Sequence, residues 1–333
     1  MKFGLYLPHH VPSASFAITP DIIIQFAEKA EKLGFDSVWT GDHLVVTSLS
    51  YTRSYLDPLT ILTALASRTR RVKMGTIVLI LPLRQPVLLA KTLATIDFLA
   101  PDRFILGVAA GYNPKEFEAT GVPIEERGDR TDECIEIVKR LLSEPNVSYA
   151  GRFYQFKDIS IEPHPVRCPP IWVGGGSMTP REGVEASVLS RKDWGMSPRV
   201  LRRIVNSDGW IARGSATVEE IANDWTTIKN AAKKSGRDPS KITFTNYSYL
   251  HLVDTKDREK ALRIQKPLFE ELLGTTKPWK YAQKVYLTGT VEDIIENIEA
   301  RRKMGVELMI LMPVSLDVNQ LELWKEEIIP QFK

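Results

Sequence analysis

The sequence predicts a (β/α)8 (TIM) barrel with insertion segments at the C-terminal face of the barrel. Eight apolar segments have the length and composition of strands, and helical segments follow them along the chain. Continuous Val/Ile/Leu runs without polar alternation are typical of strands buried on both faces, as in parallel sheets. A doubly wound open sheet is the alternative fold, because the number of strands does not prove that the sheet closes.

Capping residues and apolar runs define the predicted elements. Thr19 and Asp21 are typical of a helix start, and Gly34 is typical of a left-handed helix cap. Thr290, with Asp293 three residues later, predicts a capping box. The predicted strands cover residues 2–8, 36–40, 74–81, 104–108, 170–173, 208–211, 242–253 and 307–312. The predicted helices cover residues 20–33, 58–69, 88–99, 129–142, 198–205, 218–234, 258–273, 290–305 and 320–329.

The stretch at residues 72–113 is the unit around which the rest is organised. Two apolar runs flank an amphipathic segment, which predicts one right-handed βαβ unit. Both runs end in small or polar residues, and α/β folds build their sites at the carboxyl ends of strands. We therefore expect a ligand site at these two strand ends.

The length permits one large α/β domain or two ordinary ones. Because eight strands and their helices account for the whole chain, we expect one domain over residues 1–333. Insertions are expected at about 44–56, 144–169 and 178–197. The second of these contains two short extended pieces outside the main sheet, and the third shows no clear period.

Bulk composition excludes several classes of protein. The chain is 43% hydrophobic and 26% charged, with a formal net charge of +3, which is too small and dispersed to predict a nucleic-acid partner. No apolar run approaches the ~18 residues of a membrane span, so no membrane association is expected. Cys134 and Cys168 form no CxxC pattern. We therefore expect no metal site and no disulfide framework, and a cytoplasmic location.

Asp42 and His43 follow directly after the second predicted strand. Histidine is the natural acid or base near neutral pH, and an adjacent carboxylate supplies charge or hydrogen bonds. Barrel enzymes place catalytic residues at the carboxyl ends of strands, so the position favours a catalytic pair. The alternative is a polar pair that caps a helix or braces the loop.

Residues 174–177, Gly-Gly-Gly-Ser, follow the fifth predicted strand. Backbone N–H groups without side chains can bind a phosphate. The same residues equally suit a tight turn that needs positive φ. No GxGxxG motif and no P-loop motif is present, which argues against a dinucleotide fold and against a P-loop enzyme.

The loop at residues 109–113 has small residues that let a flat ligand approach the backbone, and Asn113 is a candidate for reading a polar edge of that ligand. The alternative is close packing of a helix against a strand. His9 and His10 stand at the end of the first predicted strand and are weaker candidates for lining a pocket.

Six segments together resemble one family. They are GFDSVWTGDH at 34–43, the stretch at 71–121, ERGDRTDECIEIVKRLL at 126–142, PPIWVGGGS at 169–177, SDGW at 207–210 and GTVEDIIENI at 289–298. The ordered set is similar to the luciferase-like monooxygenase superfamily of flavin and deazaflavin enzymes and covers most of the chain. The resemblance implies a (β/α)8 barrel, a flavin or 5-deazaflavin bound at the carboxyl face, and a homodimer.

The resemblance also implies roles for individual residues. Asp42 and His43 match the pair beside the reactive centre of the cofactor, with His43 as the acid or base. Thr76, Ile77 and Val78 match the segment that supports the ring, and a cis peptide bond is expected between the last two. The residues expected beside the ring or its tail are Ala109, Gly111, Tyr112 and Asn113. The residues expected at the phosphate are Gly174, Gly175, Gly176 and Ser177.

Two features depart from the family pattern. About twenty residues separate the phosphate turn from the helix that usually follows it at once. Ala110 stands where some members place an arginine that meets the phosphate. The second departure argues against FMN held in that manner.

The hypothesis we prefer is hydride transfer between the deazaflavin coenzyme F420 and a small organic substrate, with His43 moving the accompanying proton. One alternative is an FMN-dependent two-component monooxygenase, which uses reduced flavin, oxygen and a separate flavin reductase. A second alternative is a flavin-binding barrel without turnover.

Overall fold

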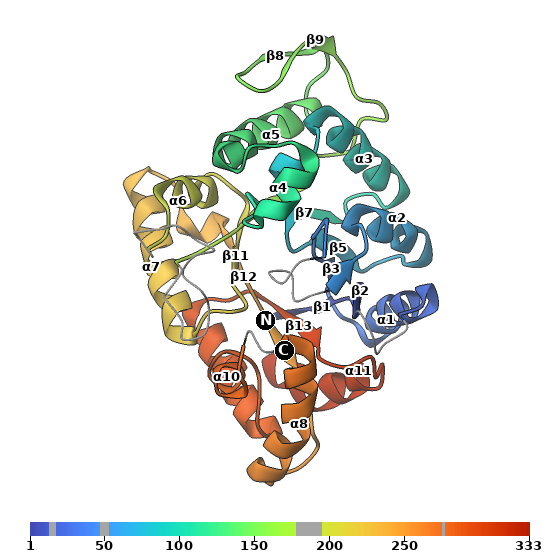
Figure 1. The fold of residues 1–333 in the computed structure, drawn as a ribbon, viewed down its shortest axis with the longest axis vertical. Helices are drawn as coiled ribbons and strands as arrows, with labels where there is room; N and C mark the ends of the chain where they lie inside the picture. The colour runs from blue at the N-terminus through green and yellow to red at the C-terminus, as the bar shows by residue number, and fades with distance from the viewer. Residues whose placement is uncertain (13–17, 47–52, 178–194, 275–276) are drawn as a thin grey trace. The chain divides into compact units, whose positions relative to one another are not determined.

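The computed structural model describes residues 1–12, 18–46, 53–177, 195–274 and 277–333 (Figure 1). Contacts divide the chain into two compact units. The first consists of Met1–Pro8, Ile18–Trp39 and Trp172–Lys333, and the second of His9–Ala17 and Thr40–Ile171. Residues 178–194 of one predicted insertion and residues 47–52 of another lie outside the described residues. The single domain stays a prediction.

The strands of the first unit are parallel neighbours. In sheet order they are β10 (Ile171–Gly174), β11 (Gly209–Ala212), β12 (Thr243–Leu250), β13 (Leu308–Pro313), β1 (Lys2–Tyr6) and β3 (Ser37–Thr40). β13 is buried along its whole length, because it pairs with β12 on one side and β1 on the other. A strand buried on both faces needs the continuous apolar run that its sequence, LMILMP, supplies.

The helices of the first unit begin and end largely where their capping residues predict. They are α1 (Pro20–Leu33), α6 (Pro198–Val205), α7 (Val218–Lys234), α8 (Arg258–Leu273), α9 (Trp279–Val285), α10 (Val291–Met304) and α11 (Gln320–Leu323). Thr19 caps α1, Gly34 ends it at a φ of 83°, and Thr290 and Asp293 form the predicted capping box of α10. The sequence did not predict α9. The predicted helix at 320–329 is α11, followed by a π-turn and a 3-10 turn.

The core of the first unit contains an aromatic stack and one buried cation. The Phe244 ring lies 4.8 Å from the ring of Trp210 and 4.6 Å from that of Trp225. Arg301 on α10 is only 1% exposed. Its guanidinium donates to Oδ1 of Asn246 at 2.8 Å and to the side chain and backbone carbonyl of Asn297. Burial lowers the pKa of Arg301 to about 10.

The second unit contains the predicted βαβ stretch. Its parallel strands are β5 (Lys73–Thr76), β7 (Phe104–Ala109) and β6 (Leu79–Ile80), and its helices are α2 (Pro58–Arg68), α3 (Pro86–Leu99), α4 (Pro114–Thr120) and α5 (Arg127–Leu141). The apolar run at 74–81, predicted as one strand, is two strands that both pair with β7. The peptide bond between them, Ile77-Val78, is cis, which confirms that expectation.

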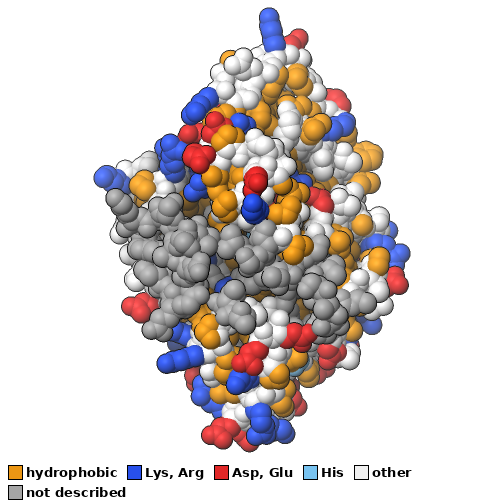
Figure 2. Space-filling model, viewed as in Figure 1, with side chains coloured by type: hydrophobic (Ala, Val, Ile, Leu, Met, Phe, Trp, Pro, Cys, Tyr) orange, Lys and Arg blue, Asp and Glu red, His pale blue; other side chains and the backbone are white. Residues whose placement is uncertain are grey.

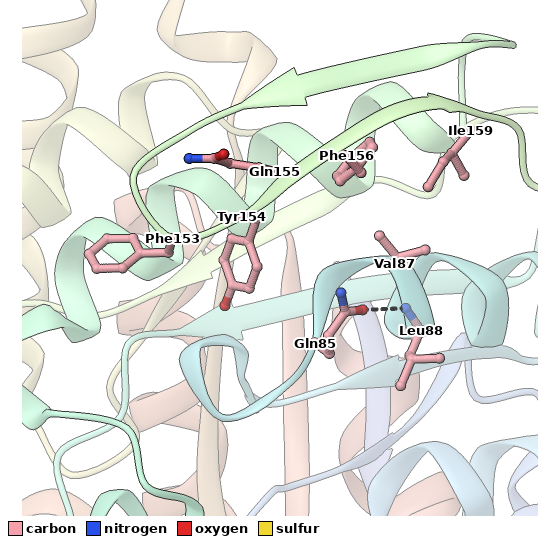
Figure 3. A pocket seen from close by; sticks show the side chains of 8 residues that line it. All are labelled: Gln85, Val87, Leu88, Phe153, Tyr154, Gln155, Phe156 and Ile159. Carbon is pink, nitrogen blue, oxygen red and sulfur yellow. Dashed lines mark hydrogen bonds between the residues drawn. The ribbon is translucent and has the colours of Figure 1, made fainter.

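Two small antiparallel pairs account for the described parts of the insertions in the second unit. β2 (His10–Pro12) pairs with β4 (Arg53–Tyr55), and β8 (Val147–Ala150) pairs with β9 (Gln155–Ile159). The second pair lies outside the main sheet, as predicted, but the two pieces were predicted at residues 151–156 and 159–163, and only 155, 156 and 159 of these lie in the observed strands. An open groove of about 490 Å³ lies between β9 and the start of α3, where Figure 3 shows Val87 and Leu88 opposite Phe156 and Ile159. None of the predicted site residues lines this groove.

Parallel strands alternating with helices make this chain a (β/α)8 barrel, and the predicted fold class is confirmed. Among the described residues, no helix is both long enough and apolar enough to cross a membrane. Figure 2 shows both acidic and basic side chains among the described residues of the visible face.

Candidate active site

His43 is held by a buried glutamate. Nδ1 of His43 lies 3.0 Å from Oε1 of Glu116, and the N–H of Leu44 donates to the same oxygen at 2.8 Å. The Glu116 side chain is fully buried, whereas the His43 side chain is 14% exposed. Oε1 is thus an acceptor, and we assign Nδ1 of His43 as the donor of the pair. Nε2 is then the nitrogen that can exchange a proton with a ligand.

The second carboxylate oxygen of Glu116 has a different environment. Oε2 is buried and has no hydrogen-bond partner among the described residues. A buried carboxylate is costly unless a charge or hydrogen bond compensates it. Among the described residues, the contacts of Oε1 with His43 and with the Leu44 N–H are the compensation that this carboxylate receives.

The short helix α4 places Glu116. Asn113 is buried, and its Oδ1 accepts the N–H of Lys115, so it is the N-cap of α4. Pro114 occupies the first helical position and Glu116 lies in the first turn, where a carboxylate is favoured. The sequence Asn-Pro-Lys-Glu contained this signal, which could have indicated both the helix and the glutamate.

Two tyrosines stand edge-on to the His43 ring. The centroid of Tyr55 lies 4.9 Å from that of His43 with planes at 65°, and the centroid of Tyr112 lies at 5.9 Å with planes at 86°. Edge-to-face contacts at such distances are favourable and orient the rings. Tyr112 is 41% exposed, so this side of His43 presents an aromatic wall that a flat or apolar ligand can contact.

His9 braces the turn before His43. The Gly41 N–H donates to Nε2 of His9 at 2.9 Å, and the His9 side chain is fully buried. The same nitrogen lies 3.0 Å from the Gly41 carbonyl oxygen. His9 therefore fixes the backbone of Gly41 instead of lining an open pocket, and the His10 side chain lies outside the described part of the chain.

Asp42 uses both carboxylate oxygens within the protein. Oδ2 accepts the N–H of Ile80 at 3.0 Å, and Oδ1 accepts from Nη2 of Arg84 at 3.0 Å. Arg84 also donates to Asp57, the N-cap of α2, at 2.8 Å. Burial raises the pKa of the Asp42 carboxyl, and the charge of Arg84 opposes that rise. These contacts agree with the alternative in which Asp42 braces the loop.

Ring-support and loop residues lie near the same strand ends. Thr76 is buried and its hydroxyl donates to the Gly107 carbonyl at 2.7 Å. Ile77 is 9% exposed, and Val78, Ala109 and Ala110 are half-buried. Gly111 has a φ of +75°, and an added Cβ would lie 2.7 Å from Cγ2 of Ile80. Only glycine fits there, so β6 and the loop after β7 approach each other closely.

The turn at residues 174–177 belongs to the first unit and is bonded internally. The Gly175 N–H donates to the Ile211 carbonyl at 3.3 Å, and Nε1 of Trp210 donates to the Gly175 carbonyl at 2.8 Å. The Ser177 N–H donates to Oδ2 of Asp224 at 2.9 Å, and its hydroxyl donates to Oδ1. Gly175 has a φ of +151°. Three of the hydrogen-bond donors expected to bind a phosphate therefore already donate to groups of the protein: the N–H of Gly175 and the N–H and hydroxyl of Ser177.

His251 is a second strand-end histidine, which the sequence reading did not single out. It follows β12 in the first unit, and Oγ of Ser315, just after β13, lies 3.4 Å from its Nδ1. Burial lowers the pKa of His251 below its ordinary 6.5, and the charge of Asp317 opposes that shift. The strand-end rule that favoured His43 applies equally here and could have found it.

This shift predicts a pH dependence of stability. The unfolded chain takes up a proton at His251 near its ordinary pKa, but the folded chain does so only at lower pH, so stability is full above 6.5 and falls as the pH drops below it. Urea unfolding of His251→Gln should show a smaller loss of unfolding free energy between pH 7.5 and 5.5 than the wild type. The exposed His164 offers the control, because His164→Gln should behave as wild type. Equal losses in wild type and His251→Gln would contradict the prediction.

The fold places this chain among the (β/α)8 barrels, a class whose enzymes build their sites at the carboxyl ends of the strands. Within that class, residues 1–183 match the model of the family described as luciferase-like monooxygenase. The chain therefore belongs to the luciferase-like monooxygenase family, which confirms the resemblance.

Similar proteins include both deazaflavin enzymes and monooxygenases. An F420-dependent glucose-6-phosphate dehydrogenase from Kineococcus radiotolerans is 34% identical over 177 residues, covering 52% of this chain and 51% of the relative. The 4-hydroxyprotoasukamycin monooxygenase of Streptomyces nodosus subsp. asukaensis is 27% identical over 265 residues, covering 79% and 67%. An F420-dependent secondary alcohol dehydrogenase, solved with an F420-acetone adduct, is 21% identical with a TM-score of 0.79, covering 100% and 99%. That structure shows the shared fold.

Proposed function

We propose that this protein is an oxidoreductase that transfers hydride between the deazaflavin coenzyme F420 and a small organic substrate. The observation that carries the proposal is the pair of His43 and Glu116 at a strand end of a luciferase-like barrel. Two similar proteins whose names state F420 dependence support the choice of coenzyme. When bound, the coenzyme supplies the hydride chemistry, and the protein supplies orientation and proton transfer.

The residues of the second unit suit the ring of such a coenzyme. Gly111 has no Cβ to occupy the space between β6 and the loop after β7. Ala109 and Ala110 are small and half-buried, and Val78, which directly precedes β6, is half-buried too. We propose that Ile77 and Val78 support the ring, with Ala109, Gly111 and Tyr112 beside it. Asn113 contributes by capping α4, the helix that carries Glu116. Thr76 contributes by its hydrogen bond to the Gly107 carbonyl, which joins the strand end of β5 to β7.

Proton movement is assigned to His43. Its Nδ1–H is fixed by Glu116, so Nε2 can give a proton to a substrate oxygen or take one from it as the hydride moves. Glu116 is a positioning residue, because it fixes the His43 ring through Nδ1 without meeting the substrate itself. Asp42 is a second positioning residue, since it holds Ile80 and Arg84 and thereby the strand ends around the ring.

Titration with both coenzymes tests the proposal. Binding of F420, followed by its absorbance and fluorescence, is expected with a micromolar or lower Kd, and FMN should bind at least about tenfold more weakly. Tight FMN binding with oxygen consumption on adding an NADH-dependent flavin reductase would support the monooxygenase alternative instead. Failure to bind either coenzyme would overturn the enzyme proposal.

The monooxygenase alternative has its own support, because the 4-hydroxyprotoasukamycin monooxygenase matches 79% of this chain at 27% identity, although an F420-dependent glucose-6-phosphate dehydrogenase matches 94% at 24% identity. A flavin-binding barrel without turnover is the third possibility, and the pair of His43 and Glu116 argues against it. The homodimer, the cytoplasmic location and, for the FMN alternative, a flavin reductase partner remain predictions. No nucleic-acid partner is proposed.

A further inference from the structure

The turn after β10 carries a carboxylate where a phosphate was expected. Asp224, on α7, is only 5% exposed. Its two oxygens bind the N–H and the hydroxyl of Ser177, which are two of the donors a phosphate would need. The N–H of Gly175, a third donor, is bonded to the Ile211 carbonyl. A phosphate at this turn would therefore have to displace Asp224.

The geometry around Gly176 shows how close the carboxylate lies. A Cβ added at Gly176 would lie 2.5 Å from Oδ2 of Asp224 and 3.6 Å from Nε of Arg213. The space that a side chain at residue 176 would take is thus filled by an acidic oxygen. Two negative groups at contact distance in a partly buried site repel each other strongly, because little water screens them.

We propose that Asp224 is a specificity-determining residue that disfavours a cofactor phosphate at residues 175–177. The proposal rests on the proposed function only in requiring a flavin or deazaflavin ligand. Asp224 keeps the donors of Ser177 occupied and places its charge 2.5 Å from the position of a Cβ at Gly176. A cofactor phosphate at this turn then contributes little to the affinity.

Two pairs of probes isolate the contribution of the phosphate. Riboflavin and FMN differ only in the phosphate, and so do 8-hydroxy-5-deazariboflavin and its 5′-phosphate. One of the two pairs is expected to bind the wild type. Within that pair, the Kd of the phosphate form and the Kd of the phosphate-free form should differ by less than about threefold, so the phosphate contributes less than the 1.4 kcal/mol of a tenfold difference. A phosphate form that binds the wild type more than about 100-fold tighter would overturn the proposal without any variant.

The variant Asp224→Asn removes the charge and keeps an oxygen that can accept the Ser177 N–H. The nearest charge to Gly176 is then the guanidinium of Arg213, which favours an anion. We expect the phosphate form to bind Asp224→Asn at least about tenfold more tightly than it binds the wild type. The Kd of the phosphate-free form should be the same in both proteins. Fluorescence quenching of the ligand measures both, and thermal unfolding checks that the variant folds.

Glu219→Gln is the matched control, because it removes one negative charge from an exposed position on the same helix. It should leave both Kd values within about twofold of the wild type. If both variants bound the phosphate form more tightly by the same factor, the net charge of the protein would be the cause, and the proposal would be overturned. Unchanged phosphate affinity in Asp224→Asn, with the ring still bound, would overturn it while leaving the proposed function intact. If no ligand of either pair binds, the proposed function fails and this inference fails with it.

Discussion

Replacing His43 with asparagine should lower the turnover number about 10²- to 10⁴-fold, the usual contribution of a positioned acid or base. Asparagine cannot exchange a proton near neutral pH, but it can still donate to Glu116, so the local structure should persist. The coenzyme Kd should change less than about threefold, because the ring contacts are unaltered. Steady-state kinetics measures the turnover number, and coenzyme titration measures the Kd.

Glu116 variants separate positioning from folding. Glu116→Gln keeps an acceptor oxygen for Nδ1 of His43, so it should retain most of the turnover, whereas Glu116→Leu should lose nearly as much as His43→Asn. A purely structural role would lower the melting temperature and the coenzyme affinity together in both Glu116 variants. Full activity in His43→Asn would show that the histidine only braces its loop, and it would remove the acid/base assignment.

Replacing Asp42 with alanine should lower the unfolding free energy by about 3 kcal/mol, the lower end for a broken buried ion pair. The substitution leaves the N–H of Ile80 without its acceptor and removes one of the two carboxylates of Arg84, which keeps Asp57. Asp42→Asn keeps an acceptor for Ile80 and should cost about half as much. Urea unfolding measures both.

The control for Asp42 is Glu118, whose carboxylate forms an exposed pair with Lys115. Glu118→Ala should change the unfolding free energy by no more than about 0.5 kcal/mol, as exposed ion pairs usually do. If Glu118→Ala and Asp42→Ala lowered the unfolding free energy by the same amount, the change in net charge, and not the buried network, would be the cause of the lower stability. An Asp42→Ala protein as stable as wild type would contradict the bracing role.

Local signals in the sequence predicted most of the fold. The caps at Thr19, Gly34 and Thr290 lie within a turn of the residues that they serve, so nearest neighbours reveal them. The cis bond at Ile77-Val78 was expected only from the family resemblance, because apolar runs show no break at that point. α4 was not predicted, although Asn113 and Pro114 are typical of an N-cap and of a first helical position.

The candidate site was harder to predict, because its decisive partners are distant in sequence. Glu116 lies 73 residues from His43, and Asp224 lies 47 residues from Ser177. No periodicity or cap relates such pairs, and only the folded chain brings them together. The strand-end rule located His43 and the turn at 174–177, but it could not show that a carboxylate already bonds that turn.

The buried guanidinium of Arg301 fixes how α10 can lie. Its described acceptors come from three elements: Asn246 on β12, the Val285 carbonyl at the end of α9, and Asn297 one turn earlier on its own helix. Sliding α10 by one helical turn, about 5.4 Å, would carry the cation away from two of these and leave it uncompensated in the core. Apolar side chains tolerate such a slip far better, because their contacts are not directional. Arg301 therefore sets the register of α10, so the core of this barrel accepts one alignment of the helix and rejects its neighbours.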